Sequence, residues 1–296
     1  MKLLFVYNPH SGVGRIRSQL SDILEIMVRA GYEVSVHPTQ AVGDAAAVAA
    51  SRAADYDLIV CCGGDGTLDE AVTGLMKSGC GVPLGYIPSG STNDFAASLK
   101  LPKNMKKAAQ IAVSGTEFKC DVGCFGEKNF IYIAAFGLFT DVSYQTKQEL
   151  KNVLGHVAYI LEGAKRIGSH PSYRMRVEYD GGVIEDEFMY GMVTNSLSVG
   201  GFKGITGDDV ELDDGLFEVM LIRTPRNAVE LNEIIAALTK LRPESDLIYT
   251  FKTEELQISP YQAIPWTLDG EYGGEQTQIR LKNMRRALTI RVPGDK

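Results

Sequence analysis

The chain has 296 residues, of which 45% are hydrophobic and 23% are charged, a composition typical of globular proteins that bury a large core. The net charge of −7 argues against nucleic acid as the main partner, because a phosphate backbone is bound by a basic surface. No apolar run reaches the roughly 18–20 residues of a membrane span. The apolar segment 1–7 is too short for a signal peptide, so we expect a cytoplasmic protein without a transmembrane segment.

The first third of the chain alternates short apolar runs with stretches of helical periodicity. The predicted strands are residues 3–7, 34–37, 57–62 and 84–87. The predicted helices are residues 16–30, ended by Gly31, residues 45–54, capped by Asp44, and residues 68–77. Strands separated by helices of this length predict βαβ units and a parallel sheet, whose ligands bind at the carboxyl ends of the strands.

From about residue 118 the pattern changes to short runs rich in β-branched and aromatic residues. They predict strands at 130–135, 174–179, 187–194, 217–222, 249–258, 278–281 and 288–292, interrupted by helices at 148–166 and 228–241. The predicted fold class is therefore α/β. A Rossmann-like parallel-sheet domain covers residues 1–122, and a mostly antiparallel β-sandwich or barrel covers residues 123–296, with the last residues free to return to the first domain.

The five cysteines are odd in number and irregularly spaced, which argues against a disulfide framework. Cys120 and Cys124 could be read as metal ligands, but no second Cys or His pair lies at zinc spacing. We therefore expect buried, reduced thiols.

The strongest motif is Gly63-Gly64-Asp65-Gly66-Thr67, directly after the third predicted strand. Glycines let backbone amides approach a phosphate, and the helix that follows, predicted from Leu68, adds a partial positive charge at its N-terminus. Asp65 suits such a site if Mg²⁺ or an ordered water bridges it to the phosphate oxygens. The alternative is a tight turn in which Asp65 caps a helix.

Two further loops have the same placement. Residues 8–15 follow the first predicted strand and offer Ser11 and the amide of Gly12, while residues 88–94 follow the fourth strand. Each loop alone would be read as an ordinary turn. Because carboxyl ends of parallel strands share one edge of a sheet, three such loops predict a common binding site there.

The second domain contains two acidic motifs. Asp213-Asp214-Gly215-Leu216 follows the acidic stretch 208–211, and it predicts either a solvated loop or a Mg²⁺ site at Asp214. Leu268-Asp269-Gly270-Glu271 predicts a hairpin turn, because an Asp-Gly pair is typical of one. The functional alternative makes Glu271 a general base that takes a proton from an attacking hydroxyl.

Taken together, these segments resemble the diacylglycerol kinase catalytic-domain family, in particular the soluble bacterial diacylglycerol kinases. GGDGT alone is shared with NAD kinases and phosphofructokinases, whereas NDFA combined with a distal LDGE is more selective. The segments lie in the order of the family and span nearly the whole chain: NPHSG at 8–12, GGDGTLDE at 63–70, PSGSTNDFA at 88–96, AAFG at 134–137, LDDGLFEV at 212–219 and LDGEYGG at 268–274.

The resemblance implies an ATP-binding α/β domain followed by a β-sandwich domain that binds lipid, with ATP in the cleft. Glu271 would be the catalytic base, and Asp65 would organise the phosphates and Mg²⁺. Asp214, with carbonyls of Glu211 and Leu216, would hold a structural Mg²⁺. The residues implied to lie at ATP are Asn8, Pro9, His10, Ser11, Gly12, Thr39, Gly63, Gly64, Asp65, Gly66, Thr67, Leu68, Asp69, Glu70, Ser91, Thr92, Asn93 and Asp94.

The implied reaction is transfer of the ATP γ-phosphate to diacylglycerol, giving phosphatidic acid, by an enzyme peripheral to the membrane and possible as a homodimer. The helical segment 144–167 could face anionic lipid through its lysines or could simply pack in the core. Val13 and Gly207 depart from the family pattern. Three alternatives remain: a kinase of phosphatidylglycerol or a sphingoid base, an NAD kinase, and a catalytically silent nucleotide-binding regulator. The presence of Asp65 and Glu271 argues against the regulator.

Overall fold

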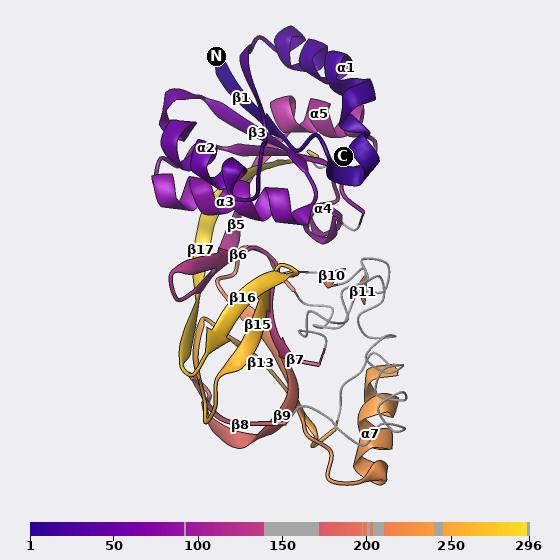
Figure 1. Cartoon of the computed structure of the whole chain (residues 1–296), viewed down its shortest axis with the longest axis vertical. Coiled ribbons are helices and arrows are strands. Elements are labelled where there is room, and N and C mark those ends of the chain that lie inside the picture. Colours follow the sequence, from indigo (N-terminus) through magenta and orange to yellow (C-terminus); the bar gives the residue numbers. More distant parts are fainter. Residues whose placement is uncertain are drawn as a thin grey trace. The chain divides into compact units, whose positions relative to one another are not determined.

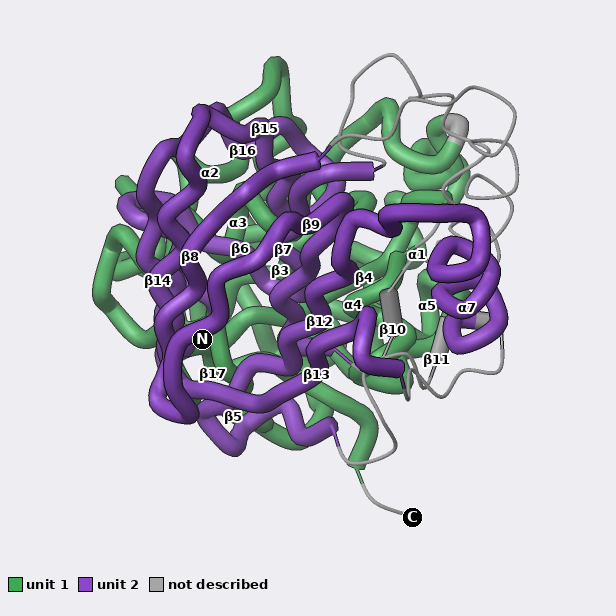
Figure 2. Tube along the Cα trace, turned by 90° about the horizontal axis from the view of Figure 1, so that it is seen from below, with its two compact units in different colours: residues 1–122, 285–296 green, residues 123–284 purple. Residues whose placement is uncertain are grey.

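The computed structural model describes residues 1–91, 93–138, 172–196, 198–199, 202–203, 210–239 and 245–294. The predicted helix 148–166, Thr92 and Gly207 lie outside the described residues. The chain divides into two compact units, coloured separately in Figure 2: unit 1 is Met1–Val122 with Arg285–Lys296, and unit 2 is Gly123–Met284.

Unit 1 is built on a parallel sheet with the strand order β17-β4-β3-β1-β2. Every residue of β3 and β4 is buried, which fits a parallel sheet covered on both faces. Strand β17 joins this sheet at Ile290, which pairs with Leu84. The strands are β1 (Lys2–Tyr7), β2 (Glu33–Pro38), β3 (Leu58–Gly63), β4 (Leu84–Pro88) and β17 (Ile279–Val292).

Helices cover both faces of this sheet, with α1 and α5 on one side and α2 and α3 on the other (Figure 1). Leu3 and Phe5 of β1 pack against α1 and α5 in one apolar cluster. Gly74 allows α2 and α3 to approach closely, because a Cβ there would lie 2.4 Å from the carbonyl oxygen of Ala46. The helices are η1 (Ser11–Gly14), α1 (Ile16–Arg29), α2 (Asp44–Arg52), η2 (Ala53–Asp55), α3 (Asp65–Ser78), α4 (Asp94–Ser98) and α5 (Met105–Ser114).

Two predicted helix starts are wrong. Asp44 is the first residue of α2 rather than its cap, since the N-cap is Gly43. Helix α3 begins at Asp65, three residues before the predicted start, so the first turn of the helix is made by the glycine-rich motif itself. The sequence interpretation also missed α5, although its N-cap Asn104 accepts a hydrogen bond from the amide of Lys107 at 3.0 Å.

Unit 2 is made of antiparallel strands, in the order β16-β15-β7-β9-β8-β14-β17, with β12 pairing β9 and β13 and with β6 pairing β5. The strands are the end of β5 (Thr116–Phe125), which begins in unit 1, and β6 (Lys128–Phe130), β7 (Ile133–Gly137), β8 (Tyr173–Tyr179), β9 (Gly182–Thr194), β12 (Phe217–Arg223), β13 (Ile248–Thr253), β14 (Glu255–Pro260), β15 (Ile264–Leu268) and β16 (Glu271–Gln276). A separate pair is formed by β10 (Ser198–Val199) and β11 (Phe202–Lys203).

The core of unit 2 centres on Trp266, which is fully buried. Its ring lies edge-on to Phe136 and Phe125, at centroid distances of 4.9 and 5.1 Å. Helix α7 (Ala228–Thr239) buries Leu231 and Ile234 in a second cluster with residues of β9 and β12. Both clusters are apolar, so burial of large side chains holds these strands together.

The predicted fold class is confirmed, since parallel strands with helices are followed by antiparallel strands. Individual strands differ from the prediction. The single strand predicted at 249–258 is two strands, β13 and β14, whereas the two predicted at 278–281 and 288–292 belong to β17. In the described part of the chain no helix is long and apolar enough to cross a membrane.

Candidate functional site

Three loops meet at the carboxyl ends of β1, β3 and β4 in unit 1, as the sequence predicts. A Cβ added to Gly12 would lie 1.7 Å from the carbonyl oxygen of Ser89, and one added to Gly90 would lie 2.6 Å from Cα of Gly64. The backbones of the three loops are therefore in direct contact, and only glycine permits this approach. Ser11 completes the junction, with its Oγ 3.7 Å from the position of a Cβ on Gly64.

The N-terminus of α3 opens into this junction. Gly64 is the N-cap and has no side chain to cap the helix, and the first intrahelical hydrogen bond runs from the amide of Leu68 to the carbonyl of Gly64. The preceding backbone N–H groups of such a turn have no partner within the helix and carry its positive partial charge. Glycine-rich backbone at a helix N-terminus is a site for an anion such as a phosphate.

Asp65 is tied to the third loop. Its Oδ2 accepts a 2.9 Å hydrogen bond from the backbone amide of Asn93. The side chain of Asn93 closes its own loop, accepting from the amide of Gly90 at 2.9 Å and donating to the carbonyl of Gly90 at 2.8 Å. The buried side chain of Asn93 thus closes its own loop, and the amide of Asn93 holds the Asp65 carboxylate in one orientation beside the N-terminus of α3.

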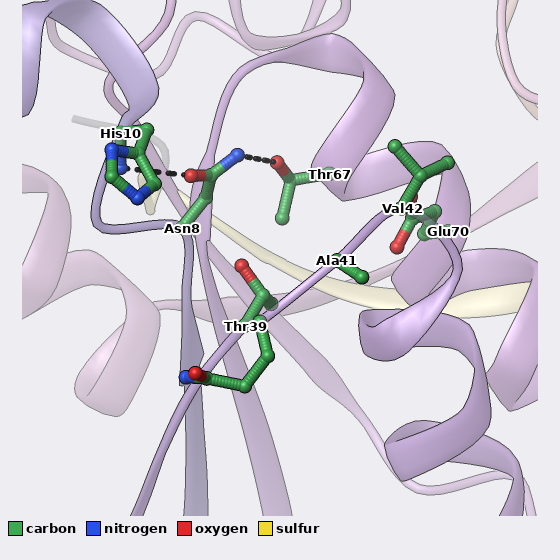
Figure 3. A pocket seen from close by; sticks show the side chains of 8 residues that line it. Asn8, His10, Thr39, Ala41, Val42, Thr67 and Glu70 are labelled. Atoms are coloured by element: carbon green, nitrogen blue, oxygen red, sulfur yellow. Dashed lines mark hydrogen bonds between the residues drawn. The ribbon is translucent and has the colours of Figure 1, made fainter.

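A pocket of about 220 Å³ lies beside this junction (Figure 3). Asn8 donates from Nδ2 to the hydroxyl of Thr67 at 3.3 Å, and its Oδ1 accepts from the amide of His10 at 2.9 Å. The pocket brings together five residues that the sequence implied and three that it did not. The lining residues are Asn8, His10, Thr39, Gln40, Ala41, Val42, Thr67 and Glu70.

The rim of the pocket is residues 40–43, the turn between β2 and α2, and carboxylates hold it at both ends. Glu70 accepts from the amide of Gly43 at 2.8 Å and from the amide of Ala45 at 3.2 Å, so this residue of α3 caps α2. Asp44 accepts from the amide of Gln40 at 2.8 Å. That bond, together with the one to the ring of His37, lowers the pKa of Asp44. Val42, between these two anchors, is almost fully exposed.

The other residues implied to lie at ATP fall into two groups. Leu68 is fully buried and Asp94, the first residue of α4, is 5% exposed, so their side chains face the interior of unit 1. Pro9, Ser91 and Asp69 are at least partly accessible, and Gly63 and Gly66 lie in the glycine-rich motif at the end of β3 and the start of α3. Thr92 is outside the described residues.

Glu271 in unit 2 lies at a hairpin, as the Asp-Gly pair in the sequence predicts. Leu268 pairs with Glu271, and the two residues between them, Asp269 and Gly270, have φ of 51° and 85°. Positive φ at both positions is typical of a type I′ turn. Glu271 is exposed at the start of β16, whereas the neighbouring Asp269 is 4% exposed.

Asp214 faces a lysine. Its Oδ1 accepts from the amide of Leu216 at 2.8 Å, and its Oδ2 lies 3.9 Å from Nζ of Lys252, which is also 3.3 Å from the buried Glu218. Burial raises the pKa of Glu218 to about 7, although Lys252 opposes that shift. Glu211 is exposed. A divalent ion at Asp214 would share the carboxylate with the Lys252 ammonium, and the Mg²⁺ at this place stays a prediction.

All five cysteines are free, as predicted, but the prediction that they are buried is wrong for Cys80 and Cys124. Burial raises the pKa of Cys62 to about 12 and that of Cys61 well above its ordinary value. Cys80 and Cys124 are half-buried, and burial also raises the pKa of Cys124.

The sequence interpretation missed the rim residues Gln40, Ala41 and Val42 and the carboxylate of Asp269. The rim follows a strand of the parallel sheet, so the rule that located the other three loops could have found it. It escaped notice because it has one glycine, Gly43, and no run of hydroxyl side chains. The Asp-Gly pair marks the turn, but no local signal reveals the hydrogen-bond partners of Asp269, since they lie more than 130 residues away.

Comparisons with known proteins agree with this architecture. The family model described as "Diacylglycerol kinase catalytic domain" matches residues 2–125. A crystal structure of a protein provisionally described as a diacylglycerol kinase, from Bacillus anthracis str. Sterne, has a TM-score of 0.83 at 26% identity and covers 98% of this chain and 97% of that chain.

Two curated relatives match along nearly the whole chain. The diacylglycerol kinase of Staphylococcus carnosus (strain TM300) is 33% identical over 294 residues, which cover 98% of this chain and 94% of the relative. That of Bacillus subtilis (strain 168) is 36% identical over 298 residues, which cover 98% of this chain and 96% of the relative. Identity at this level over both units, together with the shared fold, shows that the chain belongs to the diacylglycerol kinase family.

Proposed function

We propose that this protein transfers the γ-phosphate of ATP to the free hydroxyl of diacylglycerol and releases phosphatidic acid. Unit 1 is the ATP-binding domain and unit 2 the domain that receives the lipid. The reaction takes place at a membrane surface, where the acceptor resides, and the protein reaches it by peripheral association.

One observation supports the proposal most: three loops, each with a glycine at the contact, touch each other at the N-terminus of α3, next to a pocket lined by Asn8, Thr39 and Thr67. This is an anion site joined to a pocket with polar side chains, the two features that a nucleotide with a phosphate chain requires. The family supplies the second support, because its members are lipid kinases and use of ATP follows from that membership.

The loop junction and the pocket have separate tasks in binding the nucleotide. The first turn of α3 presents amides to the phosphate oxygens, and the hydroxyl of Ser11 adds a further donor at the same junction. Thr39 and Asn8 line the pocket in which the rest of the nucleotide lies. Phosphoryl transfer needs mainly positioning and compensation of charge, so rigid loops of this kind supply much of the catalysis.

In unit 1, Asp65 is the residue that we propose for binding Mg²⁺. Among residues with described positions, no group of three or more His, Cys, Asp or Glu side chains could hold a metal alone. Mg²⁺ in kinases is commonly held by one or two carboxylates together with the phosphates of the substrate, and Asp65 is a carboxylate fixed beside the anion site. Bound there, Mg²⁺ would neutralise part of the charge of the phosphates.

Glu271 takes the proton of the attacking hydroxyl. Its position on a tight hairpin turn, exposed at the start of β16, supports this role, because a general base must be accessible to the substrate. Asp269 precedes it but is buried and bonded to backbone, which leaves Glu271 as the accessible carboxylate of the motif.

The proposal is tested by phosphorylation with radiolabelled ATP and a panel of acceptors in mixed micelles: diacylglycerol, phosphatidylglycerol and sphingosine. We expect phosphatidic acid as the main product, and loss of the rate by a factor on the order of 10² or more in Glu271→Gln, with binding of ATP retained. If another lipid alcohol is phosphorylated preferentially, the protein is still a lipid kinase, but its substrate differs from the one proposed. Phosphorylation of NAD in lipid-free buffer, with no lipid product, would refute the proposal.

Two further expectations from the family resemblance stay predictions. A homodimer is expected by analogy with the bacterial relatives, and sedimentation equilibrium would measure it. A structural Mg²⁺ at Asp214, with carbonyls of Glu211 and Leu216, would raise the midpoint of thermal unfolding when Mg²⁺ is added, and Asp214→Asn would abolish that increase.

A further inference from the structure

The short segment 128–133 is hydrogen-bonded to the hairpin that carries Glu271 at two places, its turn and its second strand. In the turn, the carboxylate of Asp269 accepts three backbone hydrogen bonds, from Ile131 to Oδ2 at 2.6 Å and from Tyr132 and Ile133 to Oδ1 at 3.0 and 2.9 Å. On the second strand, Lys128 donates from Nζ to the carbonyl of Gly273 at 2.8 Å.

The bonds to Asp269 are of the strong kind. A carboxylate that accepts from backbone amides makes charge-assisted hydrogen bonds, which are shorter and stronger than those between neutral groups. Asp269 is only 4% exposed, so water competes little for these amides. The backbone amide of Asp269 also donates to the carbonyl of Ile133 at 2.9 Å, so main chain and side chain are fixed to the same partner segment.

The turn itself is under conformational constraint. Asp269 has a φ of 51°, a region that side chains other than Asn and Asp seldom occupy, and Gly270 follows with a φ of 85°. Beyond the turn, the register of β15 and β16 shifts between Trp266 and Thr267. A two-residue turn next to a β-bulge could adopt several backbone conformations. The three amide hydrogen bonds to Asp269 stabilise one of them.

We propose that Asp269 is a positioning residue for the reaction: it fixes the hairpin so that the Glu271 carboxylate keeps one orientation toward the hydroxyl of the lipid acceptor. The inference rests on the role of Glu271 proposed above. Asp269 does not touch substrate, because its side chain is buried and bonded to the backbone of 131–133. Small displacements of a catalytic group cost large factors in rate, which is why a buried carboxylate can affect turnover without contact to the reactants.

The Asp269→Asn variant tests this role while keeping the shape of the side chain. An amide group in place of the carboxylate removes the charge and turns one acceptor into a donor that faces backbone N–H groups. We expect kcat to fall on the order of 10–100-fold, the size typical for residues that orient a functional group. The KM for ATP should change less than about twofold, because the nucleotide pocket is built from unit 1 alone.

A double variant separates positioning from general damage. If Asp269 acts through Glu271, then adding Asp269→Asn to Glu271→Gln should reduce the residual rate no further, because the group to be oriented is already gone. If Asp269 only stabilises the fold, the two effects multiply, and this outcome would overturn the inference. A wild-type rate in Glu271→Gln alone would instead refute the proposed base, so the two failures are distinguishable.

A control and a second variant complete the experiment. Asp180→Asn removes a carboxylate that accepts from the hydroxyl of Thr253 at 2.8 Å in the turn between β8 and β9, and it should leave kcat and the rate of Glu271→Gln unchanged. If Asp269→Asn unfolds below the assay temperature, Gly270→Ala strains the same turn through its positive φ and keeps the carboxylate. Its kcat should fall while the KM for ATP is retained, and an unchanged kcat would count against the inference.

Discussion

The backbone amide of Asn93 donates a 2.9 Å hydrogen bond to Oδ2 of Asp65 and so joins the loop after β4 to the first turn of α3. The side chain of Asn93 bonds to both polar backbone atoms of Gly90, and its φ of 54° lies in the left-handed region that asparagine tolerates. Asn93 therefore shapes the loop, and the loop in turn orients the Asp65 carboxylate, which we propose to bind Mg²⁺.

Replacement of Asn93 provides the first prediction. Asn93→Ala leaves the amide of Gly90 without its acceptor and adds a strained φ, so the free energy of unfolding should fall by about 2–4 kcal/mol. Asn93→Gly loses the same hydrogen bonds without the strain and should be more stable than Asn93→Ala by about 1 kcal/mol. Urea unfolding measures both values. Equal stability of the two variants would show that the loop does not hold this backbone conformation.

Gly12 provides the second prediction. Gly12→Ala would place a Cβ 1.7 Å from the carbonyl oxygen of Ser89, a backbone atom that cannot move without opening the junction of the loops. We expect affinity for ATP, measured by calorimetry, to fall by a factor on the order of 10 or more, because the phosphate-binding loops separate. The matched control is Gly14→Ala, which shares a positive φ but has its nearest neighbour at 3.6 Å. If both variants bind ATP equally, contact between the loops is unimportant for the site.

How much of this site the sequence predicts depends on how local each contact is. The three loops follow predicted strands, so the rule for carboxyl ends of parallel strands brings them together without a structure. The same reasoning cannot reveal that Asn93 bonds to Gly90 rather than to a ligand, or that Glu70 caps another helix. Polar residues of a motif look alike in sequence, and only the geometry separates those used to build a loop from those left for a substrate.

The fold also contains some elements that the local sequence pattern predicts and others that it does not. Periodicity located α1 within one residue, since Ile16, Ile23 and Met27 form a buried stripe on that helix. It failed for α3, because the glycines of the motif suggested a loop where Gly64 caps a helix that begins at Asp65. It also failed for β17, where Arg286 at a φ of 53° interrupts the alternation without ending the strand. Backbone conformations set by distant neighbours leave no trace in a local pattern.

Glu70 supports the third prediction. Its carboxylate accepts from the amides of Gly43 and Ala45, and Glu70→Gln would turn one of its oxygens into a donor that faces an N–H group. The rim of the pocket should loosen, and the KM for ATP should rise several-fold while kcat changes less. Hydrogen exchange should become faster at residues 43–45. A rise in KM without faster exchange there would indicate that Glu70 contacts the nucleotide directly.

The cysteines give a prediction that does not depend on function. Burial raises the pKa of Cys61 and Cys62, and the thiolate is the reactive form, so both should resist alkylation in the native protein at pH 8. Cys80, which is half-buried, should be labelled first by iodoacetamide, with Cys124 slower because its pKa is also raised. Peptide mass spectrometry after timed quenching measures the order. Early labelling of Cys62 would mean that unit 1 opens readily in solution.

Val42 is the most direct probe of the pocket, because its side chain is 99% exposed and its replacement should not disturb the fold. Val42→Asp places a negative charge on the rim of a pocket that we propose to bind a polyanion. Repulsion across several ångströms of water is worth only about 0.5–1 kcal/mol, so the KM for ATP should rise about two- to fivefold at low salt with little change in kcat. The increase should shrink at 0.5 M KCl, since salt screens exposed charges. The matched control is Val183→Asp, an exposed valine of β9 in unit 2, which should leave the KM unchanged. A KM for ATP in Val42→Asp that equals the wild-type value at both salt concentrations would place the nucleotide elsewhere.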